Sequence, residues 1–575
     1  MNKGGIVMDN IQNNSNTSNQ PVLNNNPYVS PYGKPIQPKP QKKIELETVD
    51  YIFFGIFAVL SLCIVFFGLF GGMAIGFSIS AIALVVALAV YMLKNGDFTF
   101  ISVSSLVLAI ASSLVFSLYA GDQLSRFIAF VIFFSSTVLC AVSMVDDAVA
   151  DTIDGTIKVV RSIIITPFEN FLLPIRALLK NDKNKTAIQI GGAVLAAIPV
   201  LVIVIPLLAS ADAAFEGLIG KIAESLGMTI LKLIISVALL GFILSFAVSC
   251  KYELNETNSK PINFERARTL KSPFAVTFLG MIALVYLVYM FSQTAYFFSA
   301  FSGILPTGYE FTFAQYARRG FFETEAIAFI NLVLMGGILW KSVRRENGKL
   351  NPILKGIMTF ISVFTILFII TALSKMVMYI SEYGLTVLRL CTSVFMIATA
   401  VVIVAFIIRV FNPELDTMKY AFVISLSLFT VLCLCGIDRT VAHYNVNAYI
   451  SGMHDNVDLY TLGDLSESSI PYIYKLTECG NETVEKDAER VVYEIYDWHV
   501  DDSEITYDEN ETKTYTATYK TTFGFTLSEY FATKHFNKAE IGWYYPDYEY
   551  YDYYESDLYD GMVTVEEDTS VWSEI

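Results

Sequence analysis

The stretch "YIFFGIFAVLSLCIVFFGLF", residues 51–70, decides the fold class of this chain. It contains no charged residue. A run of about 20 apolar residues is long enough to cross the hydrocarbon core of a bilayer as one helix. Similar runs recur along the chain, and the sequence predicts eleven membrane spans, at residues 51–70, 74–93, 98–119, 126–145, 187–208, 229–249, 273–298, 321–340, 357–380, 385–408 and 418–436.

The composition of the whole chain agrees with this prediction. Of 575 residues, 54% are hydrophobic and 16% are charged, and the mean hydropathy is +0.51. Ordinary soluble domains are about 45–50% apolar and about 25% charged. We therefore expect an all-α polytopic membrane protein, with a transmembrane helical bundle over residues 51–436, rather than a soluble domain with one anchor.

Acidic residues are concentrated after the last predicted span. From residue 437 onward there are 30 Asp and Glu against 8 Lys and Arg, whereas the rest of the chain has 25 acids and 31 bases. Nucleic-acid binding needs a basic face, so this part of the chain argues against a nucleic-acid partner. The expected partners are the lipid bilayer and, through this acidic part, proteins or polymers of the cell envelope.

Two further segments lack the pattern of membrane spans. Residues 1–50 include "NIQNNSNTSNQPVLNNNPYVSPYGKPIQPKPQ", an Asn-, Gln- and Pro-rich composition that cannot bury a core, so we expect a disordered tail. Residues 146–186 mix apolar residues at helical spacing with charges of both signs. That pattern predicts interfacial helices lying on the inner membrane surface.

Basic residues predict the orientation of the bundle. With the N-terminus in the cytoplasm and alternating sides, the cytoplasmic segments contain 24 Lys and Arg residues and the external loops contain 4. Loops on the cytoplasmic side of membrane proteins carry such an excess. We therefore expect a multi-pass protein of the cell membrane with a cytoplasmic N-terminus. Eleven spans is an odd number, so the C-terminus is expected to be extracytoplasmic.

Residues 437–575 are predicted to form an acidic extracytoplasmic α+β domain. "DRTVAHYNVNAYI" and "SSIPYIYKLTE" have helical spacing, whereas "VVYEIYDWHV", residues 491–500, and "TKTYTATYKTTFGFTL", residues 512–527, alternate as strands do. The Tyr-rich acidic tail "WYYPDYEYYDYYESDLYDGM" could bind cations or carbohydrate, but packing of its rings on the domain is the simpler expectation.

Signatures of catalysis or metal binding are missing from the sequence. HExxH, GxSxG and GxGxxG motifs do not occur, and the four histidines are too far apart for a compact zinc motif. Cys479 is the only cysteine after residue 437, so no internal disulfide is expected there. We therefore predict no catalytic residue, no metal site and no cofactor.

Charged residues at the lip of a predicted span form the one candidate site. Arg318, Arg319, Glu323 and Glu325 begin the run at 321–340, and Lys375 and Arg389 lie near the outer ends of two other spans. A charge at membrane depth costs about 2.5–3.5 kcal/mol on insertion scales, so such groups tend to pair or to face water. We expect an ion-paired layer that could line an outward-facing cavity. The alternative is that these long side chains reach the headgroups without any cavity.

Three stretches resemble a known family. They are "YARRGFFE" at residues 316–323, "IDRTVAHYNVNAYISG" at 437–452 and "VDLYTLGDLSESSIPYI" at 457–473. They resemble a family of uncharacterised multi-spanning membrane proteins of bacteria, common in Firmicutes and known as a domain of unknown function. Thr461 departs slightly from the pattern of that family. The resemblance covers roughly residues 50–480 and supports the predicted fold, but it implies no activity, substrate or catalytic residue.

Two classes of function remain open on the sequence alone. The first is a non-enzymatic cell-envelope sensor, scaffold or partner-binding protein that presents its acidic domain outside. The second is a secondary transporter or flippase-like permease that uses the charged layer. The first is favoured, because a transporter should have a polar site near the middle of the membrane and the spans show little sign of one.

Overall fold

The fold is described here from a computed structural model of the chain. It covers residues 46–145, 213–252, 268–292, 313–343, 350–412, 417–499, 505–507, 513–515 and 526–538, together with isolated positions between 165 and 210 and residue 415. Only the backbone is described for residues 213–226, 313–321, 493, 496–499, 505–507, 513–515 and 533–538. The predicted disordered tail up to residue 45, most of the interfacial segment 146–186 and the Tyr-rich tail lie outside these residues.

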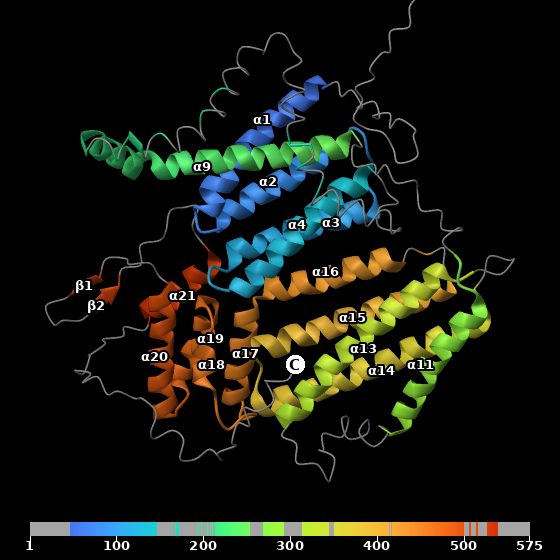
Figure 1. The fold of residues 1–575 in the computed structure, drawn as a ribbon. Coiled ribbons are helices and arrows are strands. Elements are labelled where there is room, and N and C mark those ends of the chain that lie inside the picture. The colour runs from blue at the N-terminus through green and yellow to red at the C-terminus, as the bar shows by residue number, and fades with distance from the viewer. Residues whose placement is uncertain are drawn as a thin grey trace, which may run out of the picture. The chain divides into compact units, whose positions relative to one another are not determined.

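The described elements are almost all helical (Figure 1). The long helices are α1 (Thr48–Cys63), continued by a π-helical segment (Ile64–Leu69), α2 (Ile75–Met92), α3 (Phe100–Leu118), α4 (Gln123–Val145), α9 (Ala213–Lys251), α11 (Ser272–Ser292), α13 (Phe313–Lys341), α14 (Pro352–Tyr383), α15 (Val387–Phe411) and α16 (Thr417–Cys435). They are followed by α17 (Ile437–Ile450), α18 (Leu459–Gly463), short 3-10 turns (Glu467–Ser469 and Tyr474–Glu478) around α19 (Ile470–Ile473), α20 (Glu482–His499), β1 (Ile505–Tyr507), β2 (Lys513–Tyr515) and α21 (Leu527–Lys538).

Ten of the described helices are long and apolar enough to cross a membrane. Each coincides with a predicted span to within a few residues at most ends; the longest, Pro352–Tyr383, begins earlier than expected. The remaining prediction, the span at 187–208, lies largely outside the described residues. An all-α polytopic membrane protein is therefore the correct fold class.

Small residues let the first helices approach closely. Serine and alanine fill the buried face of α3, including Ser102, Ser105, Ala109 and Ser112. Lipid tails are as apolar as the side chains of the helices, so the hydrophobic effect does not drive helices together in a membrane. They associate by close packing, which small side chains allow. The buried hydroxyl of Ser112 donates to the carbonyl of Ala109 in its own helix. The polar group is thus satisfied without a partner from the neighbouring helices α2 and α4.

A second group of helices, α11 and α13–α15, has larger apolar side chains in its core. Met335 of α13 and Leu354, Met358 and Ile361 of α14 are among the fully buried residues. Helix α16 contacts α3 and α4 on one side and α15 on the other, and so joins the N-terminal helices α1–α4 to this second group (Figure 1). The hydroxyl of Thr417 in α16 donates to the carbonyl of Ala405 in α15 over 2.9 Å.

Contacts between connections define two opposite ends of the bundle. At the first end, which we call the α2–α3 end, Asn95 bonds the carbonyl of Lys251 and the amide of Asp97 bonds the carbonyl of Met144. At the other end, the α3–α4 end, the hydroxyl of Tyr119 donates to the carbonyl of Leu434. The predicted orientation places Asn95, Met144 and Lys251 on one side of the membrane and Tyr119 and Leu434 on the other, which agrees with these two ends.

Helices α17–α21 form a small domain with its own apolar core at the α3–α4 end. The core includes Val441 of α17, Leu462 of α18, Ile470 of α19 and Val491 of α20. Leu385, from the α14–α15 connection, belongs to the same cluster. The domain therefore shares part of its core with the bundle.

The described residues do not support the predicted α+β character of this domain beyond one short pair of strands. The segment 491–500 was expected to be a strand, but residues up to His499 belong to helix α20. Ala488, Val491, Val492 and Ile495 lie at helical spacing and are buried, so one face of a helix accounts for them better than alternation does. The strands in the described part are β1 and β2, which pair antiparallel over three residues each. Within the predicted strand 512–527, the described residues form a strand at β2, and Leu527 begins helix α21.

Candidate functional site

The six charges singled out in the sequence lie on three helices. Arg318 and Arg319 fall in the first turns of α13, where only the backbone is described, so their side-chain contacts lie outside the described residues. Glu323 and Glu325 follow on the same helix, Lys375 is on α14 and Arg389 is on α15. The predicted ion-paired layer is therefore testable in this structure only for the last four.

These four charges do not share one set of contacts. The carboxylate of Glu323 on α13 interacts electrostatically with the ammonium group of Lys375 on α14. Arg389 instead donates to the carbonyls of Tyr383, over 3.0 Å, and Gly384 at the end of α14, and its guanidinium lies 3.8 Å from the ring centre of Tyr379. A cation on the last carbonyls of a helix is a favourable cap. In the described part of the chain Arg389 is thus a helix cap.

Glu325 lies deeper than the others. It is the thirteenth residue of α13, which has 29 residues, and its Oε2 accepts a hydrogen bond of 3.1 Å from the hydroxyl of Thr399. Thr399 is in turn the thirteenth of the 25 residues of α15, at the middle of that helix. Oε1 of Glu325 is shielded from solvent and has no hydrogen-bond partner in the described structure. Glu325 is thus a carboxyl group in the first turn of the span Phe322–Lys341, bonded to a threonine at the middle of α15, with one oxygen unused.

Three more polar residues lie inside the same group of helices. The hydroxyl of Tyr286 in α11 donates to Oδ1 of Asn331 over 2.8 Å, and Nδ2 of Asn331 donates to the hydroxyl of Thr365 in α14 over 2.9 Å. Asn331 is buried, and the ring of Tyr286 stacks on Phe364. Sequence reasoning missed this network, because single Tyr, Asn and Thr residues do not interrupt an apolar run.

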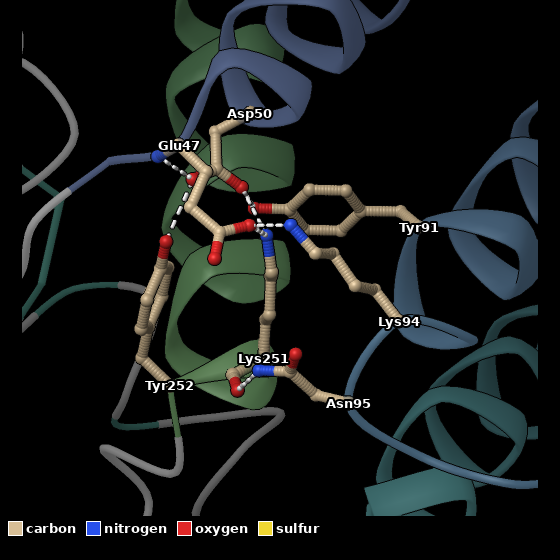
Figure 2. Close-up of polar contacts among 7 residues, drawn as sticks. All are labelled: Glu47, Asp50, Tyr91, Lys94, Asn95, Lys251 and Tyr252. Carbon is tan, nitrogen blue, oxygen red and sulfur yellow. Dashed lines mark hydrogen bonds and ion pairs between the residues drawn. The ribbon is translucent and has the colours of Figure 1, made fainter.

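A buried ion pair lies at the α2–α3 end of the bundle (Figure 2). Asp50 at the start of α1 pairs with Lys251 at the end of α9, and neither side chain has more than 1% of its surface exposed. Asp50 also accepts hydrogen bonds from the hydroxyls of Tyr91, over 2.8 Å, and Tyr252, over 2.6 Å, and from the amide of Glu47. Every oxygen of this carboxylate is therefore occupied.

The buried cation of this cluster, Lys251, lies near two aromatic rings. The ammonium of Lys251 lies 4.7 Å from the ring centre of Tyr91 and 5.3 Å from that of Tyr252. Lys94 pairs with Glu47 at the exposed edge, as Figure 2 shows. A buried ion pair offsets its desolvation only when additional hydrogen bonds satisfy both partners. This arrangement meets that condition, so it fixes the ends of α1, α2 and α9 relative to one another and leaves no group for a ligand.

Buried carboxylates join the small domain to the α3–α4 end. Asp122, in the α3–α4 connection, accepts hydrogen bonds from the amide of Ser125 and from the amide of Ile437, over 2.9 and 2.8 Å. It therefore caps the start of α4 and the start of α17 with one side chain. Only 1% of Asp122 is exposed.

Glu467 makes the second connection, from the domain back to the bundle. Its Oε1 accepts from the amides of Ala120 and Gly121, each over 3.0 Å, and from the hydroxyl of Ser528 in α21, over 2.6 Å. Glu467 is 1% exposed, and its Oε2 has no partner in the described structure. One carboxylate thus ties together the α3–α4 connection, the turn before α19 and α21.

Asp438 completes the set that we call the junction carboxylates, Asp122, Asp438 and Glu467. Its Oδ2 accepts a hydrogen bond of 3.1 Å from the amide of Ser466. Burial, followed by the negative charge of Asp122, raises the pKa of Asp438 from 3.8 to about 7. The junction therefore contains a carboxyl group that changes charge near neutral pH.

Sequence reasoning missed the junction carboxylates, although one of them had a visible signal. Asp122 directly precedes the apolar run of α4 and stands three residues before Ser125, the spacing of a helix N-cap. Glu467 lies in one of the stretches that carried the family resemblance, but nothing in that stretch indicates burial. Among the residues that the structure describes, no group of three or more His, Cys, Asp and Glu residues is arranged to hold a metal ion.

The comparison with known families places the chain. The profile of a family described as "Domain of unknown function (DUF4153)" matches residues 81–476. The chain belongs to this family. The match covers most of the bundle and the first helices of the small domain, including all three junction carboxylates and Glu325. It confirms the resemblance to an uncharacterised family. Neither a curated protein nor a solved structure matches the sequence.

Proposed function

We propose that this protein is a non-enzymatic component of the bacterial cell envelope, a sensor, scaffold or partner-binding subunit in the plasma membrane. In this proposal helices α17–α21 are presented outside the cell as a fixed domain. The observation that supports it is the contact of Glu467 with the amides of Ala120 and Gly121 and with the hydroxyl of Ser528.

Fixed docking suits a scaffold or sensor for a physical reason. A domain on a flexible tether cannot pass a change in its surroundings to a bundle. A domain whose core includes Leu385 and whose carboxylates bond bundle amides can do so. A buried hydrogen bond to a charged group contributes about 1.5–3 kcal/mol, so several such bonds hold the domain in one position.

A complementation experiment tests this proposal. In cells that lack the protein, wild type, Glu467→Gln and Glu478→Gln are expressed at equal membrane levels and competed under cell-wall stress. Glu478 is exposed in the same domain and makes a matched control. We expect Glu467→Gln to lose fitness and Glu478→Gln to keep it. Full complementation by Glu467→Gln and also by Asp122→Asn would argue against a role for the docked domain.

A second candidate, a permease, is favoured by Glu325. A carboxyl group inside a membrane helix, bonded to Thr399 and with an unused buried oxygen, is the kind of group that carries a proton or a small cation through a transporter. An apolar pocket lined by Phe322, Tyr379 and Arg389 lies about one helical turn from it along α13.

Reconstituted protein distinguishes the two candidates. Liposomes loaded with a pH-sensitive dye and polarised by a potassium gradient should show proton uptake if the permease proposal is correct. Glu325→Gln should abolish the uptake, whereas Glu382→Gln, at the exposed end of α14, should not. Absence of uptake with the wild-type protein, together with full complementation by Glu325→Gln, would exclude proton-coupled transport.

A further inference from the structure

Basic side chains gather around one tyrosine of the acidic domain. The guanidinium of Arg439 in α17 lies 5.7 Å from the ring centre of Tyr472, and the ammonium of Lys475 lies 5.2 Å from it. The ring of His443, one turn after Arg439 on α17, meets the same ring edge-on at 5.1 Å. Three of the basic groups of a domain with a large excess of acids therefore surround Tyr472.

These cations lack the partners that other cations of the domain have. Lys486 pairs with Glu482, and Arg490 lies within 3.8 Å of both Asp487 and Glu494, all along α20. In the described part of the chain, no carboxylate lies within ion-pair distance of Arg439 or Lys475. In a domain so rich in carboxylates, two neighbouring cations without one indicate a position kept for an external anion.

A pocket of about 200 Å³ opens beside Arg439 and Tyr472, and Lys475 lies next to it on the ring of Tyr472. One part of its wall is polar, with Arg439, Tyr472 and Ser528, and the other part is apolar, with Leu118 and Phe531. Pockets that enclose a drug-sized ligand measure about 300–1,000 Å³. This pocket is therefore large enough for a phosphate headgroup but too small for a whole lipid or a nucleotide.

The pocket lies at the level where the membrane spans end. Leu118 is the last residue of the span in α3, and Tyr119, which also lines the pocket, donates to the carbonyl of Leu434 near the end of α16. Lipid phosphates lie just outside the hydrocarbon core, and tyrosines are enriched at that depth. A ligand in this pocket can thus keep its acyl chains in the bilayer beside Leu118.

Arg439 is held in a way that suits phosphate. Its Nε donates to the hydroxyl of Tyr472 over 2.8 Å, and this bond holds the side chain beside the ring. The planar guanidinium has five N–H donors, so terminal donors remain for the oxygens of a phosphate. Glu467, a buried carboxylate of the same domain, is occupied by backbone amides and by Ser528 through Oε1.

We propose that this pocket binds the phosphate group of an anionic membrane lipid, with Arg439 and Lys475 as the cationic partners and Leu118 and Phe531 against the lipid's apolar part. The proposal does not depend on whether the protein acts as a scaffold or as a permease. The predicted orientation determines only which leaflet supplies the lipid.

The test uses the purified full-length protein in a zwitterionic detergent. Short-chain phosphatidylglycerol, short-chain phosphatidylcholine and inorganic phosphate are titrated separately, and binding is followed by native mass spectrometry and by the shift in thermal unfolding. We expect saturable binding of phosphatidylglycerol and a much weaker response to the other two probes. Equal binding of phosphatidylcholine, or full competition by inorganic phosphate at the same concentration as the lipid, would overturn the proposal of an anionic lipid.

Substitutions locate the binding. Arg439→Gln should weaken phosphatidylglycerol binding at least about tenfold, because a hydrogen bond to a charged group is lost. Lys475→Gln, which breaks no hydrogen bond in the described structure, should weaken it several-fold without changing the thermal stability of the lipid-free protein. The matched control is Lys486→Gln on α20, which should bind as wild type does. Unchanged binding in Lys475→Gln and in Arg439→Gln would place the lipid elsewhere.

Discussion

At the residue scale, two ion pairs at the α2–α3 end differ chiefly in burial. Asp50 and Lys251 are at most 1% exposed, whereas the side chains of Glu47 and Lys94 are 48% and 42% exposed. Removing one partner of a buried pair costs about 3–5 kcal/mol because the other charge is left uncompensated, and an exposed pair contributes about 0–1 kcal/mol. The same chemical change should therefore have two very different outcomes.

We predict that Lys251→Met strongly lowers the thermal unfolding midpoint of the protein in detergent, and that Lys94→Met leaves it nearly unchanged. The double variant Asp50→Asn with Lys251→Met should recover part of the loss, because no lone buried charge remains. Equal midpoints for Lys251→Met and Lys94→Met would mean that water reaches the pair.

The raised pKa of Asp438 predicts a pH dependence with a definite sign. Between 3.8 and about 7 the folded domain retains a proton that the unfolded chain has lost, so stability falls as pH rises through this range. For one proton the slope is at most about 1.4 kcal/mol per pH unit. Wild type should therefore lose stability relative to Asp438→Asn between about pH 5 and about pH 7. Parallel pH profiles of the two proteins in thermal unfolding would contradict the assignment to Asp438.

Sequence reasoning found charges but not their partners. It selected Glu323, Glu325, Lys375 and Arg389 because a charge inside an apolar run is visible in one dimension. It missed Asp50 and Glu467 because each lies outside the apolar runs of the sequence. Each becomes buried only through segments distant in the chain, 201 residues away for Lys251 and 347 for Ala120. Burial of a polar side chain is a tertiary property, and a local pattern does not contain it.

At the element scale, the length of an apolar run predicts a membrane helix well, because the bilayer itself requires it. Reasoning from the local pattern failed for α20, because this segment does not cross the bilayer and its length is not constrained by it. Its aromatic and β-branched residues favoured a strand, but the buried face made by Ala488, Val491 and Ile495 packs on the turn Tyr474–Glu478 and on α18 as a helix. Tertiary packing overrides local preference in such a segment.

The turn between α16 and α17 provides a prediction at this scale. Gly436 has φ of 76°, and a Cβ placed on it would lie 2.7 Å from the ring of Tyr119. Gly452 has φ of 70°, and a Cβ there would meet no atom within 4 Å. Left-handed backbone costs a non-glycine residue about 1–2 kcal/mol. Gly452→Ala should show that cost alone, and Gly436→Ala should show it plus the displacement of Tyr119. Thermal unfolding in detergent measures both, and equal losses would mean that Tyr119 moves aside freely.

At the scale of the whole molecule, contacts between helix ends constrain the path of the chain. Met144, at the end of α4, and Lys251, at the end of α9, both lie at the α2–α3 end, in contact with Asp97 and Asn95. Because α9 crosses the membrane over Gly227–Lys251, Gly227 lies on the opposite side from Val145. We therefore expect the chain to cross an odd number of times between them, which agrees with the span predicted from the sequence at 187–208.

This count determines where the small domain is. With ten spans the domain would share a side with the N-terminus. With eleven it would lie on the other side, and the excess of basic residues in the loops of the N-terminal side predicts that this other side is outside the cell. We predict that a cysteine introduced at Ser451 is labelled in intact cells by a membrane-impermeant maleimide. A cysteine at Ser15 should be labelled only after the membrane is opened. Cys435 is exposed and Cys479 is partly exposed at the domain side, so both are first replaced by serine, and that background protein is the control.

Labelling at residue 15 but not at 451 would invert the topology. Labelling of both or of neither in intact cells would mean an even number of spans, and would exclude the crossing at 187–208.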